Sequence, residues 1–154
     1  MAPSRRLYKE WEELEKAKKQ DPDIFLYPTD DNLLHWQAKL KGPVDSPYEG
    51  GTFVLEIRIP NNYPLSAPTV RLKTKIFHPN IHAKTGEICL DILKTTWSPA
   101  WTLQSVCRAI LVLLSHPEPD SPLNCDAGNL LRAGDLRGFR SVAKMYTVLF
   151  AKQD

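Results

Sequence analysis

The stretch HPNIHAKTGEICLDILKTTWSPAW, residues 78–101, decides how the rest of this chain of 154 residues is interpreted. It contains one cysteine, Cys89, in a polar loop that also holds Asn80 and Asp91. A cysteine that lies in a loop can expose a thiolate, and nucleophilic chemistry requires that exposure. A lone cysteine is more often a small buried hydrophobic residue, so the case for a nucleophile depends on the residues around it.

The turn His78-Pro79-Asn80 supplies a second candidate group, the side-chain amide of Asn80. Its NH2 can donate a hydrogen bond to a developing oxyanion, but an asparagine after a proline also closes turns by bonding to its own backbone. Gly86 can adopt a positive φ and so return the loop to Asn80. For His78 and His82 the sequence favours a chemical role no more than a structural one. The expected anchors of the loop are apolar: Ile88, Leu90, Ile92 and Leu93.

Several spaced motifs resemble those of the ubiquitin-conjugating enzymes, and the resemblance covers nearly the whole chain. The motifs are residues 78–80 (HPN), 86–93 (GEICLDIL) and 97–100 (WSPA), and upstream residues 35–37, 42–43, 46–51 and 63–64. The resemblance implies that Cys89 carries ubiquitin as a thioester and that Asn80 stabilises the oxyanion. It implies further site residues, which are Asp91, Ser121 and Leu123 at the approach of the acceptor and His78, Pro79 and Trp97 as structural support. The loop between Asn80 and Cys89 is one residue longer than in many members.

The same resemblance implies three partners: ubiquitin, the ubiquitin-activating enzyme and a RING-type ubiquitin ligase. Leu65 follows Tyr63-Pro64 in a loop and has no obvious core to fill. The basic residues of the first helix are equally consistent with a solvated face. No cofactor or metal is implied, since ATP is consumed by the upstream activating enzyme. The surface expected to bind the ligase and the activating enzyme consists of Arg6, Lys9, Leu65, Ser98, Pro99 and Ala100.

Residues 119–139 resemble, more narrowly, the peroxisomal branch of the family. That resemblance implies that a membrane-anchored partner recruits the protein to the cytosolic face of the peroxisomal membrane. The implied substrate is the peroxisomal import receptor, which is ubiquitinated on a lysine or a cysteine so that it can be reused. Ser121 stands where many family members have an aspartate. A conjugating enzyme with a general cytosolic role is the alternative.

Length and composition exclude several other classes. A chain of 154 residues with 42% hydrophobic residues suits one domain with a proper core, so residues 1–154 are expected to form a single ubiquitin-conjugating catalytic domain. The net charge of +2 gives no argument for nucleic acid. Three cysteines do not make a disulfide framework, and no stretch approaches the roughly 20 apolar residues of a membrane span. The sequence therefore predicts a cytoplasmic protein.

The spacing of the apolar residues predicts an α+β fold. It indicates a helix over residues 4–20. Short connections then favour a four-stranded antiparallel meander sheet. The catalytic loop and the C-terminal helices follow. Cys107 lies on the apolar stripe of the first of these helices, which runs from Leu103 to Leu114, and is therefore predicted to be in the core. The expected strands are residues 24–27, 33–40, 53–59 and 69–73.

The C-terminal part of the chain contains further helix signals. Ser121-Pro122-Leu123 is interpreted as the start of a helix, with Ser121 as its N-cap and Pro122 at the first helical position. Gly134-Asp135 indicates the end of that helix and the cap of the last one, whose apolar stripe runs over residues 139–150. Cys125 lies near a helix start but has no chemical setting around it, so it is not expected to be a second nucleophile.

Two functions from other classes compete with conjugation. A catalytically inactive family member, acting only as a binding subunit, would lack the cysteine, but Cys89 is present. A cysteine protease needs a base histidine and an orienting side chain beside its nucleophile, whereas the turn fixed by Pro79 favours a loop role for the residues near Cys89. Incubation with activating enzyme, ATP and ubiquitin separates the three functions.

Overall fold

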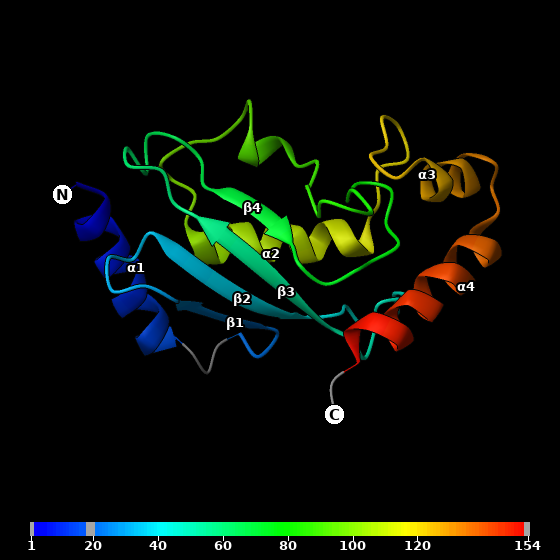
Figure 1. The fold of residues 1–154 in the computed structure, drawn as a ribbon, viewed down its shortest axis with the longest axis horizontal. Coiled ribbons are helices and arrows are strands. Elements are labelled where there is room, and N and C mark those ends of the chain that lie inside the picture. The colour runs from blue at the N-terminus through cyan, green and yellow to red at the C-terminus, as the bar shows by residue number, and fades with distance from the viewer. Residues whose placement is uncertain (1, 18–20, 153–154) are drawn as a thin grey trace.

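The protein is built on a four-stranded sheet. Figure 1 shows the first helix beside one end of this sheet, the next helix behind it, and the last helices beyond its other end. The computed structural model describes residues 2–17 and 21–152, with side chains from residue 5 onward. This is the α+β architecture that the sequence predicts. In chain order the elements are α1 (Ala2–Ala17), β1 (Ile24–Pro28), β2 (His35–Lys41), β3 (Thr52–Arg58), β4 (Thr69–Leu72), the 3-10 helix η1 (Asp91–Leu93), α2 (Leu103–Ser115), α3 (Cys125–Arg132), α4 (Leu136–Tyr146) and the π-helical η2 (Thr147–Ala151).

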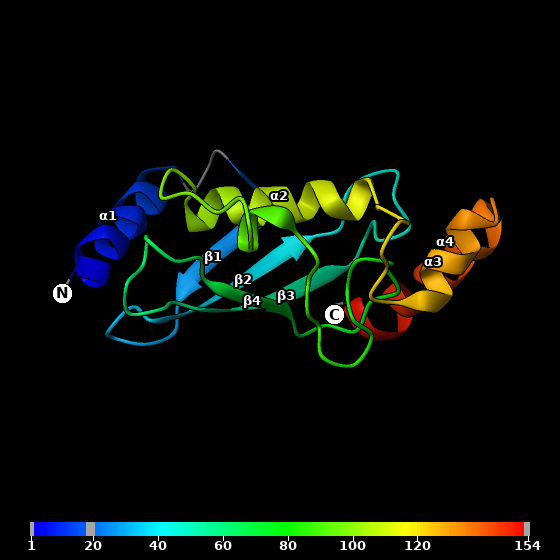
Figure 2. The ribbon, with the colours of Figure 1, turned by 90° about the horizontal axis from the view of Figure 1, so that it is seen from above.

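The sheet is antiparallel, with the strand order β1-β2-β3-β4 that a meander requires. Figure 2 shows α2 lying across one face of it. β2 begins at His35 rather than at Leu33 as predicted, because Leu33 has a φ of 62° and belongs to the preceding turn. Alternate residues of the two central strands are buried, as expected when one face of a sheet covers the core. They are Trp36, Ala38, Leu40, Phe53, Leu55 and Ile57.

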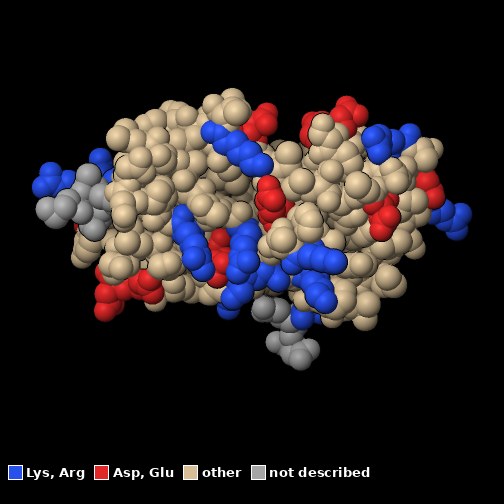
Figure 3. Space-filling model, turned by 45° about the horizontal axis from the view of Figure 1, so that its top comes forward, with Lys and Arg blue, Asp and Glu red and all other residues tan. Residues whose placement is uncertain are grey.

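The other face of the sheet is largely basic. Lys and Arg side chains gather across the lower middle of the view in Figure 3. Glu56 of β3 lies among them and pairs with Arg71 of β4 at 2.6 Å. The hydrogen bond from Arg71 holds the pKa of the Glu56 carboxyl below its usual value. The apolar core therefore lies on the side of the sheet that faces α2.

Helix α2 fills that side. Thr102 and Ser105 form a capping box at its start, in which each side-chain oxygen accepts the backbone N–H of the other residue, at 3.1 and 2.8 Å. Cys107 is fully buried on the apolar face of α2, and burial raises the pKa of its thiol to about 12. The prediction that Cys107 belongs to the core is confirmed.

Helix α1 is fastened to the core by a buried carboxylate. Glu10 accepts hydrogen bonds from the Tyr63 hydroxyl at 2.5 Å and from the backbone N–H of Leu103 at 2.8 Å. Arg6, one turn earlier, donates to the same carboxylate at 2.9 Å. Three donors satisfy a charge that would otherwise be costly to bury, so Glu10 fixes α1 against α2.

Apolar contacts of α1 lie on both sides of Glu10. Leu7 is fully buried, and the ring of Trp11 meets that of Trp36 edge-on with centroids 5.9 Å apart. Residues 18–20, which the sequence assigns to this helix, lie outside the described part of the chain. The described helix ends at Ala17.

The helix after α2 begins later than predicted. Asn124 is the N-cap of α3, and its side-chain oxygen accepts a backbone N–H of the first turn at 3.1 Å. The expectation that Ser121 is the cap and Pro122 the first helical residue is therefore wrong. Ser121 has a φ of 61° and lies in a bend. The cause is that the N–H groups of Leu123 and Asn124 bond to the Pro79 carbonyl, outside the helix, at 2.8 and 3.1 Å.

The boundary between the last two helices agrees with the prediction. Gly134 has a φ of 78°, and the Asp135 carboxylate caps α4 by accepting the Gly138 N–H at 2.8 Å. Leu149 and Phe150, which the sequence places on the apolar stripe of this helix, are exposed. The chain winds there as the π-helix η2, so a period of 3.6 residues no longer predicts which side chains are buried.

Candidate active site

The loop that carries Cys89 is closed by a tight return at Gly86. Gly86 has a φ of 76°, and a Cβ at this position would lie 2.0 Å from the carbonyl oxygen of Leu72. The backbone of Ile81 then pairs with that of Ile88, and the N–H of Cys89 donates to the Asn80 carbonyl at 2.8 Å. Gly86 therefore brings Cys89 beside Asn80, as the sequence predicts. The Cys89 side chain is half-buried.

His78 is held inside the protein below this loop. Its Nδ1 accepts the N–H of Asn80 at 3.0 Å, so its Nε2 carries the proton and donates to the Leu113 carbonyl at 2.9 Å. Burial lowers the pKa of the ring to about 4, so the ring is neutral near pH 7. Both ring nitrogens are occupied, which leaves His78 no free nitrogen to act as a base toward Cys89.

His82 also has a local structural contact. Its Nδ1 accepts the backbone N–H groups of Lys84 and Thr85, at 3.1 and 3.2 Å. The ring thus closes the turn that leads to Gly86. The sequence leaves open a chemical or a structural role for His78 and His82, and the contacts of both rings are structural.

The Asn80 amide reaches across to a distant segment of the chain. Its Oδ1 accepts the N–H of Glu118 and its Nδ2 donates to the carbonyl of Glu118, both at 2.8 Å. This contact differs from the local turn that the sequence offered as an alternative, because the partner lies 38 residues away. Nδ2 carries two hydrogens, so one N–H remains beyond the one that Glu118 accepts.

The Pro79 carbonyl brings a third segment to the same place. It accepts the N–H groups of Leu123 and Asn124 (2.8 and 3.1 Å), so the bend at Ser121 lies next to the turn that holds Asn80. Leu123 is half-buried and Ser121 is exposed. The structure thus brings residues 78–80, 89 and 121–124 together through backbone hydrogen bonds.

Asp91 lies two residues after Cys89, where it begins η1. Its carboxylate is exposed, and its backbone carbonyl accepts the N–H groups of Lys94 and Thr96 (2.9 and 3.1 Å). Asp91 is therefore the acidic side chain that follows the cysteine most closely in the loop.

A second surface is formed by two loops and the start of α1. Leu65 is 75% exposed, in agreement with the expectation that it fills no core. The Trp97 indole N–H donates to the Pro64 carbonyl at 2.9 Å, which ties the loop of Leu65 to residues 97–100. Arg6 donates to the carbonyls of Pro99 and Trp101, at 2.8 and 2.9 Å.

The guanidinium of Arg6 therefore bonds to backbone groups of its own chain. A side chain that only faced solvent, or that only bound a partner, would not need these bonds. Lys9, Ser98, Pro99 and Ala100 lie beside it on α1 and the same loop, and Lys9, Pro99 and Ala100 are exposed. The six residues predicted for this surface come from three segments, and Arg6 and Trp97 hold those segments together.

Two contributors to these sites are missed by sequence reasoning. Glu118 holds the Asn80 amide through its backbone only, so its residue type carries no signal. Glu10 has the sequence of an ordinary solvated helix residue, and its burial follows from partners that are 53 and 93 residues away. The one available hint is the pair of prolines around Glu118, which keeps that segment out of a helix.

Residues 2–17 and 21–152 show no arrangement typical of a metal site or of a membrane span. No group of three or more His, Cys, Asp or Glu side chains there is arranged to hold a metal ion. None of the helices in these ranges combines the length and the apolar character needed to cross a membrane.

Comparison with known proteins fits this arrangement of sheet, helices and cysteine loop. Residues 6–147 match the family described as "Ubiquitin-conjugating enzyme". The chain belongs to this family, which confirms the class of enzyme and the α+β fold that the sequence predicts.

Individual relatives narrow the similarity to one branch of the family. The chain is 64% identical over 146 residues to "Protein PEROXIN-4" of Arabidopsis thaliana, covering 95% of this chain and 93% of that protein. It is 60% identical over 146 residues to "Ubiquitin-conjugating enzyme E2 pex4" of Dictyostelium discoideum, covering 94% and 97%. The crystal structure of the H. polymorpha ubiquitin conjugating enzyme Pex4p, solved in complex with the soluble domain of Pex22p, has a TM-score of 0.92 and 38% identity, covering 97% and 98%. The predicted resemblance to the peroxisomal branch is confirmed.

Proposed function

We propose that this enzyme accepts ubiquitin from the activating enzyme as a thioester on Cys89 and transfers it to a lysine or cysteine of a peroxisomal import receptor. The observation that carries the proposal is the position of Cys89. It is the one cysteine that is partly exposed in a loop and bonded through its backbone to Asn80. Cys107 is buried in the core, and Cys125 begins α3 outside this loop.

The reaction consists of two acyl transfers. The first exchanges one thioester for another, and the second forms an amide on a lysine acceptor or a new thioester on a cysteine acceptor. The Cys89 thiolate attacks the carbonyl carbon of the ubiquitin thioester on the activating enzyme, a new C–S bond forms, and the cysteine of the activating enzyme leaves as a thiolate. The acceptor then attacks the same carbonyl carbon, and Cys89 leaves as a thiolate while the acceptor loses its proton. Each attack passes through an oxyanion, which a fixed N–H donor stabilises.

Asn80 is proposed to supply that donor. Glu118 holds its amide from both sides at 2.8 Å, and the remaining N–H of Nδ2 is the group available to the oxyanion. A donor that is held before the reaction needs no reorganisation during it. His78 and Pro79 support this geometry through the N–H of Asn80 and the backbone of residues 123–124.

The approach of the acceptor is proposed to run past Asp91, Ser121 and Leu123. A free lysine with a pKa of about 10.4 is neutral in only about one molecule in a thousand near pH 7, whereas a thiol with a pKa of about 8.5 is ionised in roughly one in thirty. Ser121 is uncharged, so Asp91 is the carboxylate left to orient an amine in this approach. Both acceptor types therefore remain part of the proposal.

Partners are proposed from the surface geometry and from the relatives. The face made of Arg6, Lys9, Leu65 and residues 98–100 is proposed to bind the activating enzyme and a RING-type ligase. The solved complex of Pex4p with the soluble domain of Pex22p supports a similar recruiting partner for this chain, membrane-anchored at the cytosolic face of the peroxisome. A conjugating enzyme with a general cytosolic role is the alternative, and it needs no such partner.

The test is a loading assay with activating enzyme, ATP and ubiquitin. An adduct of enzyme and ubiquitin that dithiothreitol removes is expected, and without such an adduct the chain would be an inactive binding variant. Peptide hydrolysis without ATP would indicate the protease instead. Loaded enzyme is then mixed with the cytosolic part of an import receptor, with and without the recruiting partner. Equal transfer to unrelated cytosolic proteins would favour the general role.

A further inference from the structure

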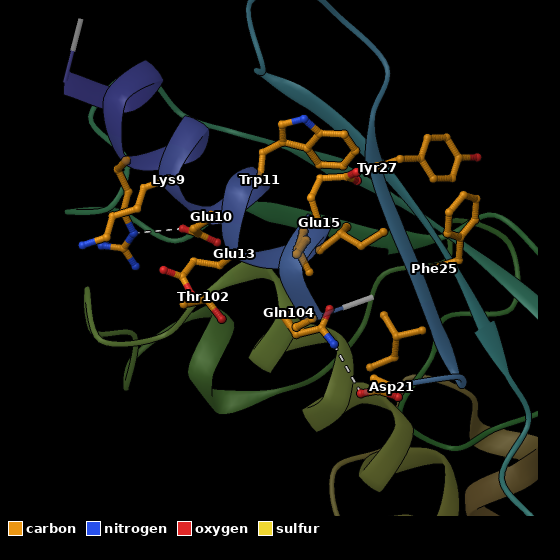
Figure 4. Close-up of a pocket in the computed structure, with 15 residues that line it drawn as sticks. Lys9, Glu10, Trp11, Glu13, Glu15, Asp21, Phe25, Tyr27, Thr102 and Gln104 are labelled. Carbon is orange, nitrogen blue, oxygen red and sulfur yellow. Dashed lines mark hydrogen bonds and ion pairs between the residues drawn. The ribbon is translucent and has the colours of Figure 1, made fainter. Parts of the chain in front are cut away.

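A groove beside α1 takes no part in the proposed chemistry at Cys89, although Arg6 and Lys9 at its rim also belong to the face proposed to bind the activating enzyme and the ligase. It has a volume of about 1010 Å³ and lies between α1, β1 and the start of α2. Figure 4 shows Trp11 and Glu13 on α1 and Gln104 on α2 around it, with the rings of Phe25 and Tyr27 pointing to the other side of β1. This volume is at the upper end of the range for ligand pockets in proteins. Helix α1 therefore leaves an open space beside β1.

The strand on one side of this groove is the edge of the sheet, because β1 pairs with β2 alone. The backbone of Asp23 bonds to that of Lys41 at 2.9 Å, and the backbone of Thr29 bonds to that of His35 at 2.8 Å. In an antiparallel pair these bonds fall on every second residue. The odd-numbered residues of β1 therefore bond to β2, and the even-numbered residues direct their backbone groups to the free edge.

These even-numbered residues are Ile24, Leu26 and Pro28. The N–H of Ile24 is directed to the carbonyl of Asp21 at 3.4 Å, and Pro28 has no N–H. The N–H of Leu26 and the three carbonyls have no partner among the residues that the structure describes. A free edge of this kind is a template for an additional strand, centred on Leu26 and limited to a few residues by Pro28.

The walls of the groove suit the side chains of such a strand. Apolar side chains line its interior. Phe25 is 62% exposed, and its ring packs against that of Tyr27 with centroids 5.0 Å apart, on the face of β1 opposite to the buried side chains of Ile24 and Leu26. The apolar lining consists of Trp11, Leu14, Ala17, Ile24 and Leu26.

The charges of the groove define the guest further. Two basic and four acidic side chains line it, and one pair of opposite sign, Arg6 and Glu10, is already bonded together. Glu13 is exposed on the wall and forms no ion pair with the described residues. At the base of the groove, the buried Oε1 of Gln104 has no hydrogen-bond partner there either, while its NH2 donates to Asp21 at 3.2 Å. Asp21 is also paired, with Arg108, and Glu15 is not free either. Glu13 is therefore the exposed carboxylate of the lining with which a basic side chain of a guest can pair.

From these observations we infer that the groove between α1 and β1 is a docking site for an extended segment of a partner protein, with alternating apolar residues and at least one lysine or arginine. The segment adds as a short strand to the free edge of β1 at Leu26, places apolar side chains against Trp11 and Leu14, and places its basic side chain near Glu13. The site is separate from the Cys89 loop, so the inference holds whichever substrate the enzyme modifies.

The test is selection of a displayed library of random seven-residue peptides on the whole chain. Recovered peptides are expected to alternate apolar residues and to contain lysine or arginine. Leu14→Trp fills the groove and is expected to abolish their binding. Circular dichroism and the melting temperature establish that this variant is folded. Peptides that bind Leu14→Trp as well as they bind the wild type, or a selection without a shared pattern, would overturn the inference.

A matched pair of charge variants tests the groove without filling it. Glu13→Lys and Glu12→Lys make the same change at neighbouring exposed positions of α1, but only Glu13 lines the groove. Binding is expected to weaken about threefold or more for Glu13→Lys, in the range of an exposed ion pair, and to stay nearly unchanged for Glu12→Lys. Equal effects would contradict the proposed position of the guest.

Amide hydrogen exchange gives a third, independent measurement. The outward N–H of Leu26 is expected to exchange freely in the unbound chain and to become protected when a selected peptide is added. Protection at other strands without protection at Leu26 would overturn the strand-addition geometry. Protection of Leu26 that rises with protein concentration alone would show that the guest is a second copy of this chain.

Discussion

The Cys89 side of the molecule and the α1–β1 side differ in how tightly they are held. Around Cys89, the buried side chains of His78 and Asn80 bond to backbone groups 35 and 38 residues further along the chain. Between α1 and β1, a groove of about 1010 Å³ separates two neighbouring elements. Polar groups that are buried and fully bonded fix one geometry, whereas an open groove can accept different guests.

The difference begins with where each side is anchored. Leu7 and Glu10 are buried and fix α1 as far as its middle, whereas Leu14 and Ala17 near its end are only partly buried. Three segments of the chain converge on the Cys89 loop through buried backbone groups. Under the proposed function, the more tightly bonded side around Cys89, which we call the rigid side, positions the reacting atoms, and the groove side is better suited to recognition of variable partners.

The largest expected effect is that of Cys89→Ser, which tests whether the rigid side carries the chemistry. The fold is expected to remain intact, and the thiol-sensitive adduct with ubiquitin is expected to be lost completely, with at most a slow oxyester in its place. Gel analysis with and without dithiothreitol measures this. Cys125→Ser is the control, since Cys125 is exposed on α3. A reducible adduct that persists in Cys89→Ser and disappears in Cys125→Ser would reverse the assignment.

Asn80→Ala is expected to load ubiquitin nearly normally and to discharge it to an amine about 10²–10³ times more slowly, because one oxyanion donor is lost. Single-turnover discharge to free lysine measures the rate. Asn129→Ala, at an exposed position of α3, is the control. Glu118→Pro removes the N–H that holds the amide but leaves the amide in place, so its effect is expected to be smaller. Unchanged discharge in Asn80→Ala would make Asn80 a purely structural residue.

The buried ring of His78 is expected to make the rigid side sensitive to acid. Its folded pKa of about 4 lies below the ordinary 6.5, so the stabilisation is complete above pH 6.5 and is lost as the pH falls toward 4. The difference between the folded and the ordinary pKa of His78 corresponds to about 3 kcal/mol in the free energy of unfolding. Urea unfolding between pH 7 and pH 4.5 measures it. His78→Gln, although less stable overall, should have a flatter profile in this range; an equal slope would locate the acid sensitivity elsewhere.

Leu65→Ala is expected to have the smallest effect on the enzyme alone and to act only through a partner. Stimulation of discharge by a ligase should be lost, by about tenfold or more, as for a residue at the centre of an interface. Loading should be unchanged, and the melting temperature should change by about 2 °C or less. Val44→Ala is a matched control, because Val44 is 74% exposed and Leu65 75%. A large fall in melting temperature would place Leu65 in the core.

The parts of the structure that sequence could predict depend on local patterns. Gly86 and Gly134 mark positions of positive φ, and Cys107 follows from an apolar period. Ser121 was assigned wrongly as a cap because Ser-Pro is a valid local start of a helix. The actual start depends on the Pro79 carbonyl, which takes two backbone N–H groups before the helix begins.

The sequence could not predict the contacts between distant segments of the chain. The bonds of Arg6 to Pro99 and Trp101 span 93 and 95 residues. The groove beside β1 depends on the angle at which α1 leaves the sheet, and no local pattern sets that angle. The roles of the site residues in the reaction also remain predictions until the variants above are measured.

The bonds of residues 78–80 to Leu113, Glu118 and residues 123–124 have a consequence for the timing of synthesis. A chain that has grown only to residue 112 already contains Cys89, but lacks each of these partners. At about 5–20 residues per second, residue 124 is added about 2–7 s after Cys89. The thiol thus leaves the ribosome earlier than the groups that hold its neighbour Asn80. A chain that ends before these partners is therefore expected to present a cysteine without the geometry for transfer, and a competent site marks a chain that has grown past residue 124.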